Sequence, residues 1–185
     1  MRELSLHILD LVQNSLTAGA QLIEINVEED LDLDQLEITI RDDGQGMSPE
    51  MVDRALDPFV TTKTTRRVGL GLPLFAQHAE QCGGELTIGS SLGSGTTVRA
   101  RFRRSHIDRV PLGNLVDTVT MLVMCNPERD FVFRHRLGDK ENHLSTVEMR
   151  EALGSDLPIN SPEVLKWLQG YLEQGEARLH GGGEA

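Results

Sequence analysis

The chain has 185 residues, of which 38% are hydrophobic and 25% are charged, as is typical of a globular protein. Its 18 Lys and Arg against 29 Asp and Glu give a net charge of −11, which argues against non-specific binding to nucleic acid or an anionic membrane. Two isolated cysteines, no signal-peptide pattern and no run of roughly 20 apolar residues predict reduced thiols and a cytoplasmic location.

The first hundred residues predict helices and strands that alternate along the chain. Residues 3–18 have the apolar spacing of a helix, which ends near Gly19. Residues 21–30 and 36–42 alternate apolar and polar side chains, and their short connection predicts an antiparallel pair of strands. A second helix begins at Ser48 and Pro49, which are favoured at the N-cap and the first helical position.

Residues 59–69 show no periodicity and are expected to form a loop, followed by a helix over about 70–82. The segments 85–91 and 96–102 predict a hairpin across Leu-Gly-Ser-Gly. These elements indicate an α/β (α+β) two-layer sandwich, with an antiparallel-rich sheet covered by helices on one face.

After residue 103 the pattern predicts a helix over 112–125, strands over 130–137 and 142–147, and a helix over 161–174. The last residues, 175–185, are expected to be a disordered tail. We therefore divide the chain into a domain of residues 1–103, a small α+β extension of residues 104–174, and the tail.

Asp10 and Asn14 lie four residues apart in the first predicted helix, so their side chains share one helical face. A second polar cluster, Arg-Asp-Asp-Gly-Gln-Gly-Met at 41–47, follows a predicted strand. Gly44 and Gly46 allow tight turns and close approach of a ligand, and an Asp there would accept a hydrogen bond from a ligand amine. By themselves, these features also fit a solvent-exposed helical face and an ordinary acidic turn.

The third cluster spans 57–74 and combines hydroxyls, a cation and glycines. Thr61, Thr62 and Lys63 lie in the predicted loop, and Gly69 and Gly71 open the following helix. Unpaired N–H groups and the helix dipole at a glycine-rich helix start attract phosphate. No Lys-Ser or Lys-Thr follows the last glycine, so this is not a P-loop.

Together and in this order, the three clusters and Gly-Ser-Gly-Thr-Thr at 93–97 resemble the GHKL ATPase superfamily over residues 4–103. That superfamily includes gyrase B, the heat-shock chaperone ATPases, histidine kinases and MutL proteins. The resemblance implies a Bergerat-type ATP site that holds ATP with Mg²⁺ beneath a mobile lid. It assigns Mg²⁺ coordination to Asn14, and contact with the adenine amine to Asp42, supported by Thr96. The full set of nucleotide-binding residues that it implies is Asn14, Asp42, Gly44, Gly46, Met47, Thr61, Thr62, Lys63, Gly69, Leu70, Gly71, Leu72 and Thr96.

Three positions bear on the branch of this superfamily. Histidine kinases usually have Asn where this chain has Asp10, and the hydrolysing and serine-phosphorylating branches have an acid there. The resemblance therefore implies that Asp10 is a general base. His7, one turn earlier, would either orient Asp10 or pack in the core. Arg67 replaces a glycine of the family's phosphate loop, and would either contact the phosphates or remain solvated.

Residues 105–141 are similar in outline to the segment that follows the ATPase domain in MutL-type proteins, and they would equally fit an appendage that covers the sheet. We expect an ATP- and Mg²⁺-binding regulatory protein, either a Ser/Thr-type protein kinase or an ATPase, that acts with a protein partner. The alternatives are an ATP-gated switch without catalysis and a histidine-kinase-type domain acting in trans. An oligomeric state is possible for each of these functions.

Overall fold

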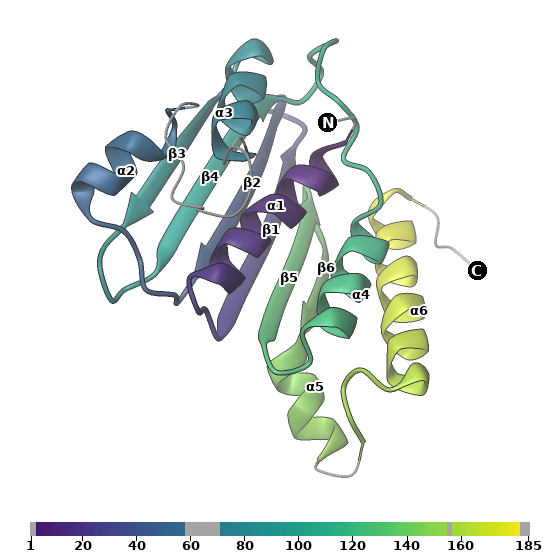
Figure 1. The fold of residues 1–185 in the computed structure, drawn as a ribbon. Coiled ribbons are helices and arrows are strands. Elements are labelled where there is room, and N and C mark those ends of the chain that lie inside the picture. The colour runs from purple at the N-terminus through teal and green to yellow at the C-terminus, as the bar shows by residue number, and fades with distance from the viewer. Residues whose placement is uncertain (1–2, 58–70, 155–156, 182–185) are drawn as a thin grey trace.

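The computed structural model describes residues 3–57, 71–154 and 157–181. These residues form six helices and six strands (Figure 1). In chain order they are α1 (Leu4–Thr17), β1 (Leu22–Asp30), β2 (Gln35–Asp42), α2 (Pro49–Ala55), α3 (Gly71–Gln81), β3 (Glu85–Ser90), β4 (Thr96–Arg103), α4 (Leu115–Cys125), β5 (Asp130–Leu137), β6 (Lys140–Ser145), α5 (Thr146–Leu153) and α6 (Pro162–Leu179).

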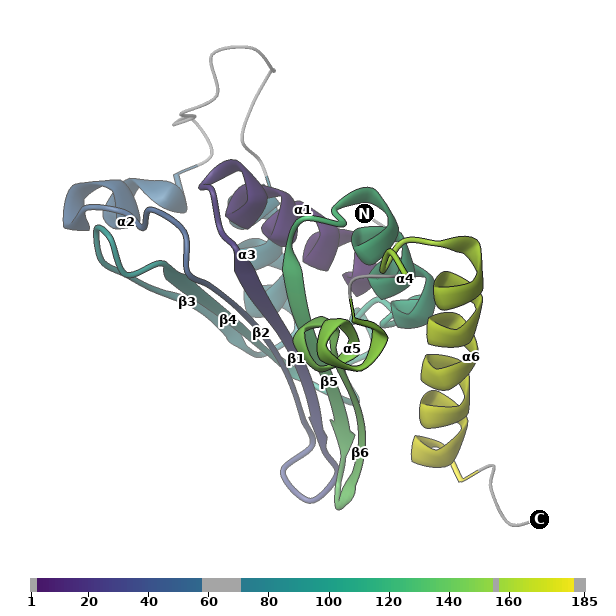
Figure 2. The same ribbon diagram turned by 90° about the horizontal axis from the view of Figure 1, so that it is seen from below.

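All six strands form one sheet in the order β3-β4-β2-β1-β5-β6. Every neighbouring pair is antiparallel except β1 and β5, which are parallel. Helices α1, α3, α4 and α6 lie on the same face of this sheet (Figures 1 and 2). This confirms the predicted α/β sandwich, with an antiparallel-rich sheet and one helical face.

The core lies between the sheet and these helices. The strands alternate buried and less buried residues, as in β1, where Ile23, Ile25 and Val27 are fully buried. Ile8 and Val12 of α1 pack on the same core. No helix in the described ranges has the length and apolarity needed to cross a lipid bilayer.

The segment after residue 103 extends the sheet. Strand β5 pairs with β1 from Leu22 opposite Asp130 to Glu29 opposite Leu137. The helical layer over this half comes from α4 and α6 (Figure 2). The predicted boundary after Arg103 therefore falls between strands that share one sheet.

Two local predictions were wrong. Residues 175–179 belong to α6 rather than to a disordered tail, because Gly175 and Leu179 continue its buried stripe. The predicted strand over 142–147 ends at Ser145, and α5 begins at Thr146. Ser145 caps α5 by accepting a hydrogen bond from the Glu148 N–H at 3.4 Å. The spacing of Ser145 and Glu148 is that of a capping box, a signal for this helix that the strand prediction missed.

Candidate functional site

Helix α1 presents Asp10 and Asn14 beside the start of α3. Asp10 is exposed and Asn14 is half-buried. A Cβ atom on Gly71 would lie 3.5 Å from Asp10 Cβ and 3.6 Å from its Oδ2. The first residue of α3 thus approaches the Asp10 carboxylate closely, as the family resemblance implies for a site shared by these helices.

Asp42 ends strand β2 and is buried, with 8% of its surface exposed. Its Oδ2 accepts a hydrogen bond from Ser15 Oγ at 2.6 Å, and its Oδ1 accepts one from the Gly44 N–H at 2.9 Å. Each carboxylate oxygen keeps a lone pair for a further donor. Asp42 therefore has the chemistry needed to accept a hydrogen bond from a ligand amine.

Thr96 begins β4 directly opposite Asp42 in the sheet. Its hydroxyl lies 2.9 Å from Ser90 Oγ, which also donates to the Gly95 carbonyl at 2.9 Å and accepts from the Met47 N–H at 2.8 Å. Because Ser90 has one hydroxyl proton and gives it to Gly95, the Thr96 hydroxyl is the donor between the two side chains. Ser90 thereby ties the loop after β2 to the strand that carries Thr96.

Gly44 and Gly46 allow close packing beside Asp42. A Cβ on Gly44 would lie 3.0 Å from both Asp42 Oδ1 and Ala18 Cβ. Gly46 has φ +69°, and a Cβ there would collide with the Ser91 carbonyl oxygen. A larger residue at Gly44 would crowd the carboxylate, so the absence of a side chain fits the approach of a flat base edge to Asp42.

His7 is a packing residue. Its ring stacks on Phe75 with the centroids 4.5 Å apart, and it is 3% exposed. Burial, together with the nearby His78, lowers the pKa of His7 to about 4, so its imidazole is neutral at pH 7. Of the two roles considered for His7, the structure supports packing in the core.

Leu72 is the remaining predicted residue that the structure describes. It lies in the first turn of α3, is partly buried and packs against the core. Six positions with predicted roles fall outside the residues that the structure describes: Thr61, Thr62, Lys63, Arg67, Gly69 and Leu70.

Sequence reasoning missed Ser15 and Ser90, the two serines that hold the site together. Ser15 is 4% exposed and projects from the buried face of α1 toward the sheet. A serine at a core-facing position directly after Asn14 was the available signal, because a buried hydroxyl needs a hydrogen-bond partner.

A family model described as histidine kinase-, DNA gyrase B-, and HSP90-like ATPase matches residues 2–106. The match covers more than half of the chain and includes Asp10, Asn14, Asp42 and Thr96. The chain belongs to this ATPase family. The GHKL resemblance of its motifs is thereby confirmed, and ATP is the nucleotide that this family binds.

Curated relatives of this ATPase family match part of the chain. The histidine protein kinase DivJ of Caulobacter vibrioides is 36% identical over 105 residues, which are 55% of this chain and 18% of DivJ. The C4-dicarboxylate transport sensor protein DctB of Pseudomonas aeruginosa is 41% identical over 63 residues, 34% of this chain and 10% of DctB. The chain therefore spans less than a fifth of either relative.

A solved structure described as the N-terminal domain of a DNA repair protein superposes with a TM-score of 0.53 and 18% identity. The superposition covers 78% of this chain and 53% of that one. At this identity the likeness concerns the fold alone, and its extent requires that part of the segment after the ATPase family match is included.

The ATPase family implies a Mg²⁺ ion with the nucleotide. Among the described residues, no group of three or more His, Cys, Asp or Glu side chains could hold a metal ion. The Asn14 carboxamide supplies one neutral oxygen, which fits an ion whose other ligands are phosphate oxygens and water. By the family resemblance, Asn14 would contact a Mg²⁺ ion that arrives bound to the nucleotide.

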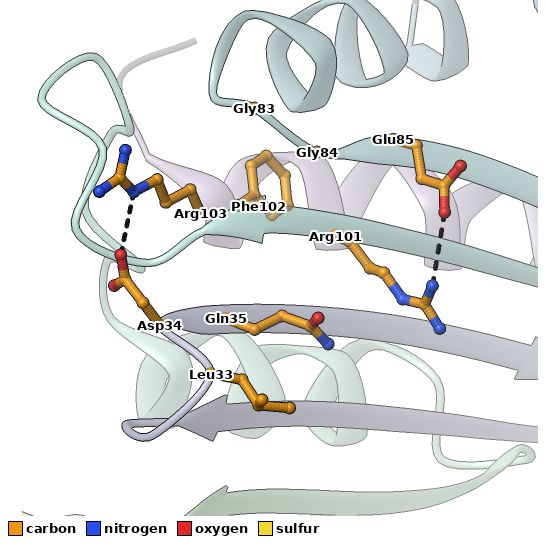
Figure 3. A pocket seen from close by; sticks show the side chains of 9 residues that line it. All are labelled: Leu33, Asp34, Gln35, Gly83, Gly84, Glu85, Arg101, Phe102 and Arg103. Atoms are coloured by element: carbon orange, nitrogen blue, oxygen red, sulfur yellow. Dashed lines mark hydrogen bonds and ion pairs between the residues drawn. The ribbon is translucent and has the colours of Figure 1, made fainter.

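A hollow lies beside the ends of β2, β3 and β4, at residues 33–35, 83–85 and 101–103 (Figure 3). The hollow lies at the end of the sheet where Gln35 of β2 pairs with Arg103 of β4. At the other end of the same two strands, Asp42 pairs with Thr96. Seven residues of strand separate the two ends, or about 23 Å.

The charged groups around this hollow are paired with one another. Arg103 Nε lies 3.0 Å from Asp34 Oδ2, and Arg101 NH1 lies 3.4 Å from Glu85 Oε1 (Figure 3). Arg101 Nε also contacts Glu37 Oε2 at 2.7 Å. The charges of its two arginines are thus balanced by Asp34 and Glu85, which does not favour a nucleotide phosphate, and the candidate site remains the Asp42 end of the sheet.

Proposed function

We propose that this protein binds ATP with Mg²⁺ in the cytoplasm and transfers the γ-phosphoryl group to water or to a serine or threonine of a protein partner. The observation that carries the proposal is the Asp10 carboxylate, which lies against Gly71 and four residues before Asn14 on α1. A carboxylate at this place is suited to accept a proton from a neutral hydroxyl.

The other residues have separate roles in this proposal. Asp42 accepts a hydrogen bond from the adenine amine, and Gly44 leaves room for the base. Asn14 holds the Mg²⁺, which when bound neutralises charge on the phosphates. Thr61, Thr62 and Lys63 belong to the proposed lid, and Gly69, Leu70 and Gly71 to the proposed phosphate-binding helix start.

A second candidate is a histidine-kinase-type domain acting in trans. It is favoured by the sequence similarity to DivJ and DctB, which are named as a histidine kinase and a sensor protein. Against it stands Asp10, because an imidazole acceptor is already nucleophilic and gains little from a general base. A non-catalytic ATP-gated switch would use the same binding residues without turnover.

Incubation with γ-labelled ATP, with and without candidate partner proteins, tests these functions. We expect released phosphate or an acid-stable label on a partner hydroxyl. Asp10→Asn should lower turnover by about 10²- to 10⁴-fold while ATP remains bound. Asp43→Asn is the control, since Asp43 accepts hydrogen bonds from the Gln21 and Leu22 N–H groups away from α1.

An acid-labile, alkali-stable label would identify a phosphohistidine and contradict the proposal. Binding without turnover, unchanged in Asp10→Asn, would identify the switch.

ATP binding itself is tested by thermal unfolding. A ligand that binds the folded chain stabilises it by RT ln(1 + [L]/Kd), about 2.7 kcal/mol at a hundredfold excess over Kd. We expect ATP and ADP with Mg²⁺ to raise the melting temperature. Melting curves that millimolar nucleotide leaves in place would contradict the assignment of the ligand.

A further inference from the structure

The N-terminal turn of α1 is capped by backbone from a distant segment. The N-cap residue Glu3 makes no side-chain cap. Instead the Leu4 N–H donates to the Pro111 carbonyl at 2.9 Å, and the Ser5 N–H donates to the Leu112 carbonyl at 2.8 Å. The first N–H groups of a helix have no partner within it, so residues 111 and 112 satisfy two of them.

This segment is fixed on the side of the sheet extension. The Arg109 side chain donates to the carbonyls of Arg104 at 2.6 Å and Val110 at 3.1 Å, and Val110 and Leu112 pack on the core. Two residues later, Asn114 caps α4 by accepting from the Asp117 N–H at 3.0 Å. The segment that carries the capping carbonyls is thus also held by contacts outside α1.

Gly113 brings the segment into close contact with α1. Its φ is +81°, and a Cβ there would collide with Glu3 Oε2 and Ser5 Oγ. A Cβ atom there would also lie 2.9 Å from Glu3 Cβ, so the Glu3 and Ser5 side chains, and the turn that carries them, would have to shift. The close fit of the segment against the first turn of α1 therefore depends on Gly113.

Helix α1 carries Asp10, Asn14 and Ser15, whereas Asp42 and Thr96 belong to the sheet. A shift of α1 moves the phosphate and metal side of the site relative to the adenine side. We propose that residues 110–113 position α1 in the nucleotide site, with Gly113 as the positioning residue. This inference rests on the proposed function, because it assumes that ATP spans both sides.

The test compares Gly113→Ala with Gly154→Ala. Gly154 also has a positive φ, +68°, but no atom of the described residues lies within 4 Å of its Cβ position, so the control has backbone strain without the collision. Affinities for Mg·ATP and adenosine are measured by calorimetry at a temperature where both variants are folded. We expect Gly113→Ala to lose about tenfold in Mg·ATP affinity, which corresponds to the loss of about one polar contact, and to change less for adenosine, which lacks the phosphates that face α1.

A merely structural role would lower the melting temperature of Gly113→Ala and leave the ratio of the two affinities unchanged. That result would overturn the inference. Failure of the wild type to bind ATP is a separate outcome, which would defeat the proposed function and this inference with it.

If Gly113→Ala does not fold, hydrogen exchange of the wild type tests whether residues 110–113 position α1 in the nucleotide site. Coupling between two sites is reciprocal, so Mg·ATP bound near Asn14 should slow exchange of the Leu4 and Ser5 amides. The N–H groups of α5, which lies near the other end of α4 (Figure 1), serve as the internal reference. Unchanged exchange at Leu4 and Ser5 with ATP bound would overturn the inference.

Discussion

The Asp42 carboxylate accepts hydrogen bonds from Ser15 on one oxygen and from the Gly44 N–H on the other. These two donors come from a helix and a loop, so Asp42 is oriented by elements on both sides. An Asn in its place would present an NH₂ group to one of these donors. The cost of such a mismatch at a buried position is about 1–3 kcal/mol.

We therefore predict that Asp42→Asn weakens adenosine binding more than Asp10→Asn does, because Asp10 lies on the proposed phosphate side. Calorimetry with adenosine measures the difference. Asp43→Asn is a suitable control: its Oδ1 accepts from the Gln21 and Leu22 N–H groups, and an Asn carbonyl preserves both bonds. Equal adenosine affinities for Asp42→Asn and Asp10→Asn would contradict the adenine assignment.

His135 connects the two halves of the sheet through buried ionic contacts. Its Nε2 lies 3.3 Å from Glu29 on β1, and its Nδ1 lies 2.9 Å from Glu176 on α6. Burial alone would lower the pKa of His135, but hydrogen bonds to Glu176 and Glu29 outweigh it and raise the pKa to about 9. The pKa of Glu29 falls to about 2, chiefly through its hydrogen bond with His135 and despite burial, and its contact with Arg104 at 2.7 Å adds to this.

The raised pKa predicts a loss of stability with rising pH. His135 binds its proton more tightly in the folded chain than in the unfolded chain, where the pKa is 6.5. Its contribution is therefore complete below pH 6.5 and disappears as the pH rises toward 9, with a slope of at most about 1.4 kcal/mol per pH unit.

Urea unfolding between pH 6.5 and 9 should show this slope in the wild type and in His143→Gln, a neighbouring half-buried histidine on β6. His135→Gln should lack it. Parallel curves for His135→Gln and the wild type would show that His135 is not protonated in the fold.

At the level of elements, the loop after β2 contacts both α1 and the β3–β4 turn. The Gln45 N–H donates to the Ala18 carbonyl at 3.0 Å, and the Gly93 N–H donates to the Gln45 carbonyl at 2.8 Å. Together with the contact between Met47 and Ser90, these bonds join a helix end, a loop and a turn around Asp42.

Gly46→Ala should break this junction. A left-handed backbone costs a non-glycine residue about 1–2 kcal/mol, and Gly93→Ala, at φ +77° with nothing within 4 Å, incurs that cost alone. Gly46→Ala adds the collision with Ser91. We expect Gly46→Ala to lower the free energy of unfolding well beyond Gly93→Ala, as measured by urea unfolding. Equal losses of unfolding free energy in the two variants would mean that the turn at Ser91 moves aside without cost.

Elements with strong local signals were predictable. Ser48 and Pro49 marked the start of α2, and Ser48 does cap it through the Met51 N–H. Alternation along 21–30 and 36–42 predicted β1 and β2. Residues 175–179 were missed because Gly175 and the polar residues around it resemble a tail, although Gly175 packs directly on Asn142. Helix α5 was missed because the predicted strand continued through its N-cap, Ser145.

At the scale of the whole molecule, the motifs predicted the ATPase family that the match over residues 2–106 confirms, but not how the extension joins the sheet. Pairing of β1 with β5 joins residues more than a hundred positions apart, and hydrophobic alternation in either strand does not specify its partner. The capping of α1 by the carbonyls of Pro111 and Leu112 was not predictable either, because every residue has a backbone carbonyl and the sequence does not indicate which of them will bind a given helix end.

The predicted boundary after Arg103 leads to the last test. A fragment of residues 1–103 would expose the edge of β1 that pairs with β5, and would lose the buried side chains of Phe131, Phe133 and Leu168. It would also lose the carbonyls that cap α1. Unpaired strand edges promote association, and lost core contacts lower stability.

We therefore expect the 1–103 fragment to unfold without a cooperative transition and to bind Mg·ATP far more weakly than the full chain. Circular dichroism during heating and calorimetry at low temperature measure the two effects. A fragment of residues 1–181, which keeps every described element, is the control and should match the full chain. Cooperative melting and full ATP affinity of 1–103 would show instead that the family-matched region folds alone, and that β5, β6 and α6 are accessory to it.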